Sequence, residues 1–274
     1  MEEESAQFSV QELFQHKIDE STEYLSTAFA DAVSEEEQGK PSLVPPQPHR
    51  EYLKQQFKAV LNKGKQTFEQ GANVVFETLQ YLAEHGESEE ERLLLSDMLQ
   101  GDFLTFIEGC AYYVVHPEQA RTAMEGGKSI ATICGMSETT LRGLYHAAKY
   151  VYEQKRYEEA SQAFTFLLYI NATVPFFWLC LGNAEFYCKR YESALVAYSR
   201  AIILDPMDMS AYLYGVKCLE NLGQIEQACQ LLDAALMALD ASQDEKKQEW
   251  KTQIERERVR LSSLLPTYLS GGGV

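Results

Sequence analysis

Histidine and cysteine, the side chains that most often ligate metals or act as nucleophiles, lie scattered along this sequence. None of the 5 histidines falls in an H-E-x-x-H frame. The 6 cysteines form no C-x-x-C pair, and no histidine lies at zinc-ligand spacing from a pair of them. We therefore expect no metal site and no cofactor. The thiols are expected to be reduced and mostly buried, as in cytosolic proteins.

The sequence also lacks the glycine-rich and nucleophile motifs of common enzymes. It contains neither G-x-S-x-G nor G-x-G-x-x-G. The run Gly126-Gly127-Lys128-Ser129 ends like a phosphate-binding loop, but Thr122 stands where that loop needs its first glycine. We predict that the chain is not an enzyme and acts by binding. Residues 1–115 are the one region where an activity is left open.

Charge and composition narrow the kinds of partner. The 274 residues include 24 lysines and arginines against 41 aspartates and glutamates, which gives a formal charge of −17. This excess argues against binding to nucleic acid or to anionic lipid, because both depend on clustered basic side chains. With 45% apolar residues, the chain can bury a sizeable core.

No segment of the sequence reads as a membrane-targeting element. The first ten residues lack the basic and apolar regions of a signal peptide. The uncharged stretch 160–184 holds Asn171, Thr173 and Pro175 near its middle, which suits a repeat better than a bilayer span. We therefore expect a cytoplasmic protein without stable membrane insertion.

A repeat with a period of 34 residues dominates the second half of the chain. Ala160, Ala194 and Ala228 are spaced by that period, and large apolar residues hold further columns. The middle unit, from Trp178 to Pro206, follows the tetratricopeptide pattern of W-x-x-L-G, then small, aromatic and proline positions. Each such unit is a pair of antiparallel helices. The sequence predicts an all-α fold: a tetratricopeptide helix-pair solenoid with an additional N-terminal helical region.

The chain divides into five predicted segments. Apolar residues at helical spacing predict a first amphipathic helix, and four prolines in eight residues predict a linker after it. Helical periodicity then resumes, with Gly64 and Gly71 as points where the helix could break. The segments are 1–33 (N-terminal amphipathic helix), 34–49 (acidic, proline-rich linker), 50–120 (helical region of unknown role), 121–242 (leader helix and repeats 141–174, 175–208 and 209–242) and 243–274 (C-terminal capping helix and flexible tail).

The first helix of each pair lines the concave side of such a solenoid, so its inward positions recur with the unit. These positions are aromatic and aliphatic at one end of the groove and mixed-polar at the other, where Glu220 and Asn221 are found. This mixture suits an extended peptide, because pockets take its apolar side chains while polar groups bind its backbone. Packing between helices is the competing explanation for any single tyrosine. The predicted peptide-binding residues are Tyr145, Lys149, Tyr152, Leu179, Asn183, Phe186, Tyr187, Leu213 and Lys217.

Residues around the first unit carry a resemblance to a known family. The pattern L-Y-x-x-A-x-x-x-Y-x-x-x-[KR]-[YL]-x-[DE]-A is matched by Leu144-Tyr145, Ala148, Tyr152, Arg156-Tyr157 and Glu159-Ala160. Gly135-Met136 stands where the leader helix of that family ends. Residues 120–240 therefore resemble the class II chaperones of bacterial type III secretion, acidic tetratricopeptide proteins that hold translocator subunits before export. The long segment before the leader departs from the family pattern.

The resemblance implies a cytoplasmic, ATP-independent chaperone of a bacterial type III secretion system. Its groove is expected to bind the N-terminal segment of a hydrophobic translocator protein and keep it soluble. Helices before the repeats are expected to allow a homodimer. The alternative is a general tetratricopeptide scaffold that joins proteins in a complex and has no chaperone role.

The linker raises a further hypothesis. Cargo peptides of the family dock with a P-x-L-x-x-P pattern, and Pro41, Leu43 and Pro46 reproduce it. We hypothesise that this segment can occupy the groove of its own chain, or of a sister subunit, when cargo is absent. An ordinary proline-rich spacer is the alternative.

Overall fold

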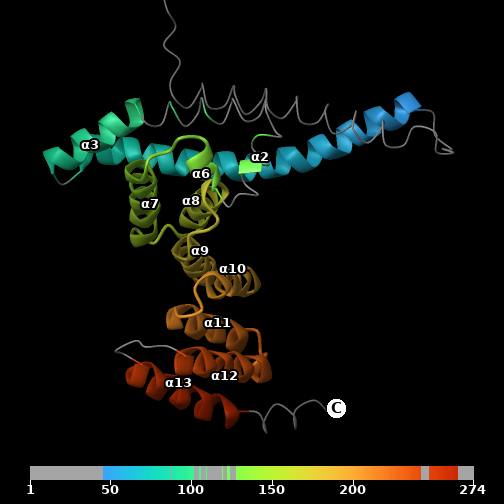
Figure 1. The fold of residues 1–274 in the computed structure, drawn as a ribbon, viewed down its shortest axis with the longest axis vertical. Coiled ribbons are helices and arrows are strands. Elements are labelled where there is room, and N and C mark those ends of the chain that lie inside the picture. The colour runs from blue at the N-terminus through green and yellow to red at the C-terminus, as the bar shows by residue number, and fades with distance from the viewer. Residues whose placement is uncertain are drawn as a thin grey trace, which may run out of the picture. The chain divides into compact units, whose positions relative to one another are not determined.

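The computed structural model describes residues 46–86, 88–101, 128–241 and 247–264, together with residues 105, 109, 119, 122 and 123. The regular elements named within these ranges are all helices, which confirms the predicted fold class (Figure 1). None of the described helices is long and apolar enough to cross a bilayer. The helices are α2 (Pro46–His85), α3 (Glu89–Gln100), α6 (Ile130–Ile133), α7 (Glu138–Glu153), α8 (Tyr157–Ile170), α9 (Pro175–Tyr187), α10 (Tyr191–Leu204), α11 (Met209–Asn221), α12 (Ile225–Ala241) and α13 (Lys247–Ser262).

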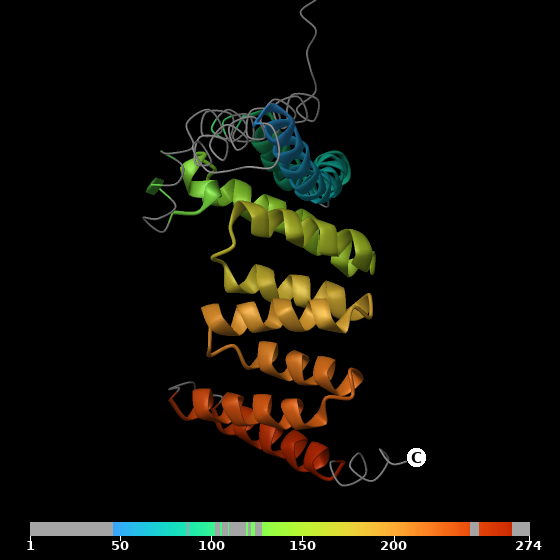
Figure 2. The same cartoon turned by 90° about the vertical axis from the view of Figure 1, so that its right-hand side faces the viewer.

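The chain divides into two compact units, each of which is described by itself. The N-terminal unit comprises residues 1–151 and 165–171, and the repeat unit comprises residues 152–164 and 172–274. In the repeat unit, α9 packs on α10, α10 on α11, α11 on α12, and α12 on α13. Figure 2 shows these helices stacked in chain order. This is the arrangement that the repeat pattern predicts for the second and third units.

The small residues of the repeat pattern are placed where helices approach closely. A Cβ atom added to Gly182 of α9 would lie 2.5 Å from Cε1 of Tyr198 on α10. Tyr198 is fully buried, and Ala194 and Ala201 on the same helix are buried with it. The ring of Tyr198 therefore occupies the space that the missing side chain of Gly182 leaves, and no larger residue fits there without a shift of the two helices.

The Gly182→Ala variant tests this close approach. We expect a loss of about 1–3 kcal/mol in the free energy of unfolding, because the added methyl group overpacks a fully buried ring. Alanine otherwise favours a helix interior by about 1 kcal/mol relative to glycine, so a stabilised variant would contradict the packing described here. Urea denaturation measures the difference, with Gln230→Ala on the exposed face of α12 as the control.

Helix α2 differs from the sequence prediction in two ways. It begins at Pro46, inside the segment 34–49 that the sequence assigns to a linker, and it continues through Gly64 and Gly71 without a break. Proline is tolerated in the first turn of a helix, where its missing N–H has no partner to bond. Pro41 and Leu43 lie outside the described residues, so the hypothesis that this segment occupies the groove stays a prediction.

Packing within the N-terminal unit explains why α2 does not break at its glycines. Phe68 and Phe76 of α2 lie with their ring centroids 5.0 and 6.2 Å from that of Phe166 on α8. Tyr81 of α2 lies 6.1 Å from Tyr150 of α7. Phe68 lies between the two glycines, and Phe76 and Tyr81 follow them. Burial of this large aromatic surface outweighs about 1 kcal/mol of helix propensity per glycine.

Helix α3 packs on α2, and its Met98 also approaches α7. A Cβ atom on Gly143 of α7 would lie 2.5 Å from the sulfur of Met98 on α3, and Met98 is itself buried. Together, α2 and α3 cover the apolar side chains of α7 and the end of α8 within this unit. Residues 46–100 therefore do for this end of the repeats what a capping helix does in other solenoids, which is to cover an otherwise exposed apolar face.

The Phe166→Ala variant tests this covering role. Phe166 is fully buried, so we expect its truncation to cost about 3–5 kcal/mol and to loosen α2. Hydrogen exchange of the α2 amides is the direct measurement, and faster exchange there is the expected result. Phe176, which is half exposed, provides a matched Phe→Ala control. Unchanged protection of α2 in the Phe166 variant would show that other contacts hold it.

Candidate peptide-binding groove

The predicted groove residues are divided between the two units. Tyr145 and Lys149 lie on α7 in the N-terminal unit, where Tyr145 is half-buried and Lys149 is exposed. The other seven lie in the repeat unit, at the end of α7 and on the first helices α9 and α11. Those seven are Tyr152, Leu179, Asn183, Phe186, Tyr187, Leu213 and Lys217.

A continuous row of aromatic rings, which we call the aromatic row, runs from the end of α7 to α11. Tyr157 and Tyr187 stack with centroids 4.6 Å apart, and Tyr152 meets Tyr187 edge-on at 6.1 Å. Phe186 contacts Tyr187 at 5.8 Å and Tyr214 of α11 at 6.3 Å. The row thus consists of Tyr152, Tyr157, Tyr187, Phe186 and Tyr214. Tyr187 has half of its surface exposed, so the row presents apolar ring surface to solvent.

Two polar groups flank the aromatic row. Asn183 accepts a hydrogen bond through Oδ1 from the hydroxyl of Tyr198 at 2.8 Å, which fixes the amide and leaves its NH2 group as a donor. The ammonium of Lys217 lies 4.8 Å from the ring centroid of Tyr214. Such a cation above a ring face is held by the ring quadrupole. Amide and ammonium donors therefore stand beside ring surface, as the sequence predicts for a site that binds the backbone of a peptide.

Burial keeps two phenol groups in and next to the aromatic row protonated at neutral pH. Burial, together with the nearby hydroxyls of Tyr187 and Tyr157, raises the pKa of Tyr152 above its usual range. Burial likewise raises the pKa of Tyr198. These phenols stay protonated, so they are neutral and can donate a hydrogen bond.

Leu179 is placed differently from the other predicted groove residues. It is 8% exposed and lies in a core cluster with Ala194, Tyr198 and Ala211. Its side chain packs the helix pairs together and offers a peptide little surface. The competing explanation of helix packing, which the sequence leaves open for groove positions, therefore describes Leu179 better than it describes Tyr187.

A buried carboxylate holds the turn beneath the aromatic row. Glu185 of α9 is 7% exposed and accepts hydrogen bonds from the Ser161 hydroxyl and from the Arg190 guanidinium. Arg190 approaches it as a fork, with Nε at 2.5 Å and Nη2 at 3.0 Å, and also pairs with Glu158. These bonds raise the pKa of Arg190. The network ties α8, α9 and the start of α10 together next to Tyr157 and Tyr187.

Removal of the guanidinium tests this network. The Arg190→Ala variant leaves a buried carboxylate with too few donors, so we expect a loss of about 1–3 kcal/mol in the free energy of unfolding. Arg200 is an exposed arginine on the same helix and gives a matched Arg→Ala control. Guanidinium denaturation of both variants is the measurement, and equal midpoints would mean that solvent satisfies Glu185 instead.

Sequence reasoning missed part of the site. The counting of inward positions from Trp178 passes over Tyr214, although its ring joins the row to α11. The sequence also assigns residues 243–265 to a solvating cap, whereas α13 lines a cavity together with α11. A signal for the second feature exists, because apolar and polar residues of α13 recur at helical spacing from Trp250 onward.

Comparisons with known proteins find similarity to one curated protein and to structures of type III secretion proteins. No family model matches the sequence. The chain is 29% identical over 105 residues to the low calcium response locus protein H of Yersinia pestis, which covers 38% of this chain and 62% of that protein. The chain thus spans less than two thirds of the length of this curated relative.

Two solved structures extend the comparison. The chain resembles a T3SS complex from Aeromonas hydrophila with a TM-score of 0.50 and 20% identity, over 53% of this chain and 96% of that one. It also matches the Yersinia enterocolitica type III secretion chaperone SycD in complex with a peptide of the translocator YopD, with a TM-score of 0.42 and 23% identity, over 46% and 95% of the two chains. The similarity in sequence to protein H agrees with the resemblance predicted from the sequence, and the Aeromonas structure supports the fold.

Proposed function

We propose that this chain is an ATP-independent chaperone of a bacterial type III secretion system. It binds the N-terminal segment of a hydrophobic translocator in the groove of its repeats and keeps that protein soluble until export. It acts in the cytoplasm by binding alone, without a reaction or a cofactor. The chain also forms a homodimer in this proposal, as the resemblance implies.

The observation that carries the proposal is the aromatic row beside uncharged amide groups. An extended apolar segment must lose water from its side chains and still satisfy its backbone N–H and C=O groups. The rings of Phe186 and Tyr187 supply apolar surface, and the free NH2 group of Asn183 supplies a donor for a backbone carbonyl. The only charged residue of α9, Glu185, is buried and paired, so α9 itself presents no bare charge to a bound segment.

The proposal that the partner is a translocator comes from the start of the first repeat, whose sequence resembles that of translocator chaperones. Leu144-Tyr145, Tyr152 and Arg156-Tyr157 match the positions that resemble translocator chaperones. In this chain, Tyr152 and Tyr157 contact each other at 5.4 Å and lead into the aromatic row. Tyr152 and Tyr157 therefore belong both to the sequence resemblance and to the proposed binding surface.

Co-expression with a candidate translocator tests the function. We expect the translocator to be soluble only when this chain is present. Replacing both Phe186 and Tyr187 by Ala should weaken the complex at least tenfold, because truncating a buried aromatic anchor typically costs about 2 kcal/mol or more. Co-purification and a titration of the purified partners are the measurements.

Val196 and Ile203 provide the control, since both are exposed apolar residues on α10 outside the aromatic row. Their Ala variants should bind the translocator as the unmodified chain does. A translocator that is equally soluble without this chain would favour the scaffold alternative. Binding retained by the Phe186 and Tyr187 variant, with its helix content unchanged, would place the site elsewhere.

A further inference from the structure

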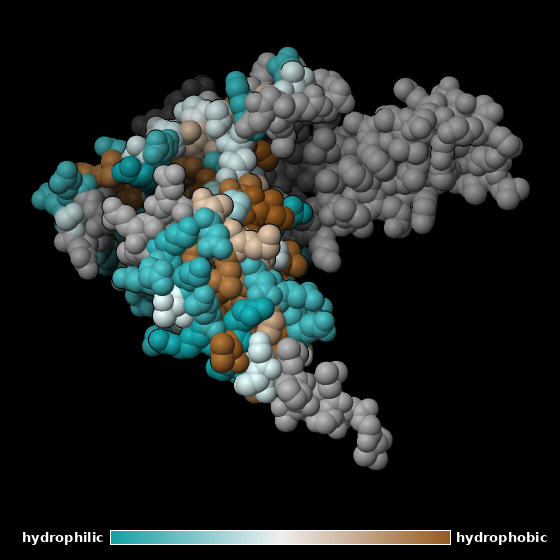
Figure 3. All heavy atoms as spheres, turned by 60° about the horizontal axis from the view of Figure 1, so that its bottom comes forward, coloured by the Kyte–Doolittle hydropathy of each residue, from teal (hydrophilic) through white to brown (hydrophobic). Residues whose placement is uncertain are grey.

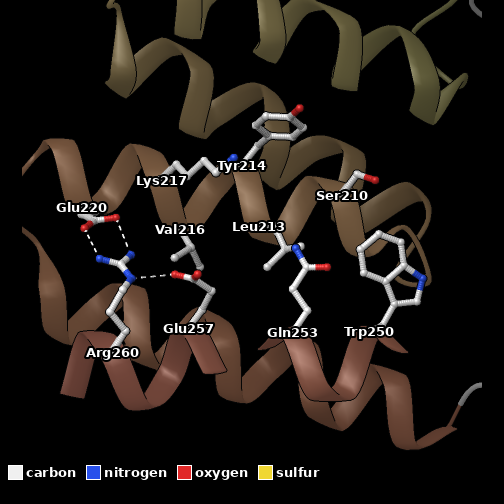
Figure 4. A pocket seen from close by; sticks show the side chains of 10 residues that line it. All are labelled: Ser210, Leu213, Tyr214, Val216, Lys217, Glu220, Trp250, Gln253, Glu257 and Arg260. Atoms are coloured by element: carbon white, nitrogen blue, oxygen red, sulfur yellow. Dashed lines mark hydrogen bonds and ion pairs between the residues drawn. The ribbon is translucent and has the colours of Figure 1, made fainter. Parts of the chain in front are cut away.

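The last helix forms a second concave surface with α11, which we call the end pocket. It is a cavity of about 490 Å³, within the range of about 300–1,000 Å³ that is usual for binding sites. Leu213, Tyr214 and Val216 of α11 line one side, and Trp250 and Gln253 of α13 line the other (Figure 4). A helix that only caps a solenoid exposes polar side chains to solvent. The apolar lining of the end pocket therefore suggests a further role for α13.

The register of α13 matches that of α11 with an offset of 40 residues. Leu213 and Lys217 on α11 correspond to Gln253 and Glu257 on α13, and all four line the end pocket. Glu220 corresponds to Arg260 in the same way. Helix α12 has 17 residues where α10 has 14, and this contributes to an offset larger than the repeat period of 34. Helix α13 therefore takes the place of a fourth groove-lining helix.

Both ends of α13 are attached to the repeats, so the end pocket is a fixed feature. Arg260 donates to the two carboxylate oxygens of Glu220 at 2.6 and 2.8 Å and to Glu257 at 2.9 Å. These bonds lower the pKa of Glu220, chiefly through the hydrogen bonds from Arg260. At the other end, Trp250 packs against the C-terminal core cluster, in which Ile254 is fully buried. The space between these two attachments stays open.

Three polar side chains of the end pocket have no partner among the described residues. Among the described residues, the side chains of Ser210, Trp250 and Gln253 form no hydrogen bond. An indole N–H, a hydroxyl and a primary amide therefore face the cavity with free donors. The amide of Gln253 can both donate to a backbone carbonyl and accept from a backbone N–H, which is the pairing that an extended peptide offers.

The charges of the end pocket favour one kind of neighbouring residue. Arg260 is shared between Glu220 and Glu257, so these three groups largely satisfy one another. The ammonium of Lys217 forms no ion pair with any described residue and lies over the ring of Tyr214. It is the free cation of this cavity, and it complements a carboxylate on an incoming chain.

We propose that the end pocket is a further peptide-binding subsite that takes one large aliphatic side chain with an acidic residue next to it. Leu213, Val216 and Trp250 surround the aliphatic side chain, Gln253 binds the adjoining backbone, and Lys217 binds the acid. Tyr214 belongs to both the aromatic row and the end pocket, so one extended chain can run from the first into the second. The inference rests on the proposed function in one point: the peptide in the end pocket is part of the same translocator segment that binds the aromatic row.

A displayed library of random twelve-residue peptides tests the subsite without knowledge of the natural passenger. Selection on the full chain should enrich peptides with Leu, Ile or Met within two positions of Asp or Glu. Selection on a Lys217→Gln, Gln253→Ala variant should lose that pairing. Lys217 and Gln253 are both exposed, so these changes leave the core intact. The same pairing on both proteins, or enrichment of Lys and Arg beside the aliphatic residue, would overturn the proposal.

Affinities of one selected peptide, measured by fluorescence anisotropy, provide the quantitative test. We expect Gln253→Ala and Lys217→Gln each to raise Kd at least fivefold. Gln248→Ala, an exposed glutamine on the same helix that does not line the cavity, should leave Kd unchanged. Equal Kd values for the Gln253 and Gln248 variants would contradict the assignment.

The outcomes separate this inference from the proposed function. A translocator that depends on Phe186 and Tyr187, yet is indifferent to Gln253 and Lys217, leaves the chaperone function standing and removes the subsite. Conversely, a chain that solubilises no translocator but selects the aliphatic–acidic pairing through Gln253 keeps the subsite and loses the chaperone function.

Discussion

The packing of Tyr198 is the interaction on which the repeat unit depends. Its ring fills the space above Gly182, stacks on Tyr214 at 5.7 Å, and is fully buried. Its hydroxyl donates a hydrogen bond to Oδ1 of Asn183, which fixes the amide of that residue. One side chain thus sets the distance between α9 and α10, the plane of a ring in the aromatic row and the direction of a hydrogen-bond donor. Binding surface and core are consequently not independent in this protein, because a change in helix spacing moves the donors and the rings together.

The parts of the fold that could be predicted from sequence are those set by local repeats. The buried positions of Gly182, Ala194 and Tyr198 recur with the unit, so the period of 34 residues identifies them directly. The continuity of α2 could not be predicted, because its glycines favour a break and only the ring contacts with Phe166, far along the chain, oppose it. Local propensity is a weak guide wherever tertiary packing supplies more free energy than the propensity costs.

The binding surface was predictable in kind but not in extent. Counting inward positions finds Phe186 and Tyr187, since these follow the geometry of a helix within one unit. The same counting places Leu179 in the groove although it is buried in the core, because a one-dimensional count does not weigh how closely the neighbouring helix approaches. It also stops at the third unit, since α12 is longer than α10 and the residues of α13 therefore depart from the repeat period, which hides their correspondence with α11.

The excess of acidic residues has a distribution that suits a protein with an apolar groove. Helix α9 carries a single ionisable acid, Glu185, and this is buried and paired with Arg190, so its exposed rings stand in a neutral stretch. Helix α13, in contrast, alternates acids and bases, and the face viewed from that end is largely hydrophilic with apolar side chains between (Figure 3). A net charge of −17 favours solubility. The acidic excess thus helps to keep a chain with exposed aromatic rings in solution, while α9 adds no exposed charge that an apolar segment would have to desolvate.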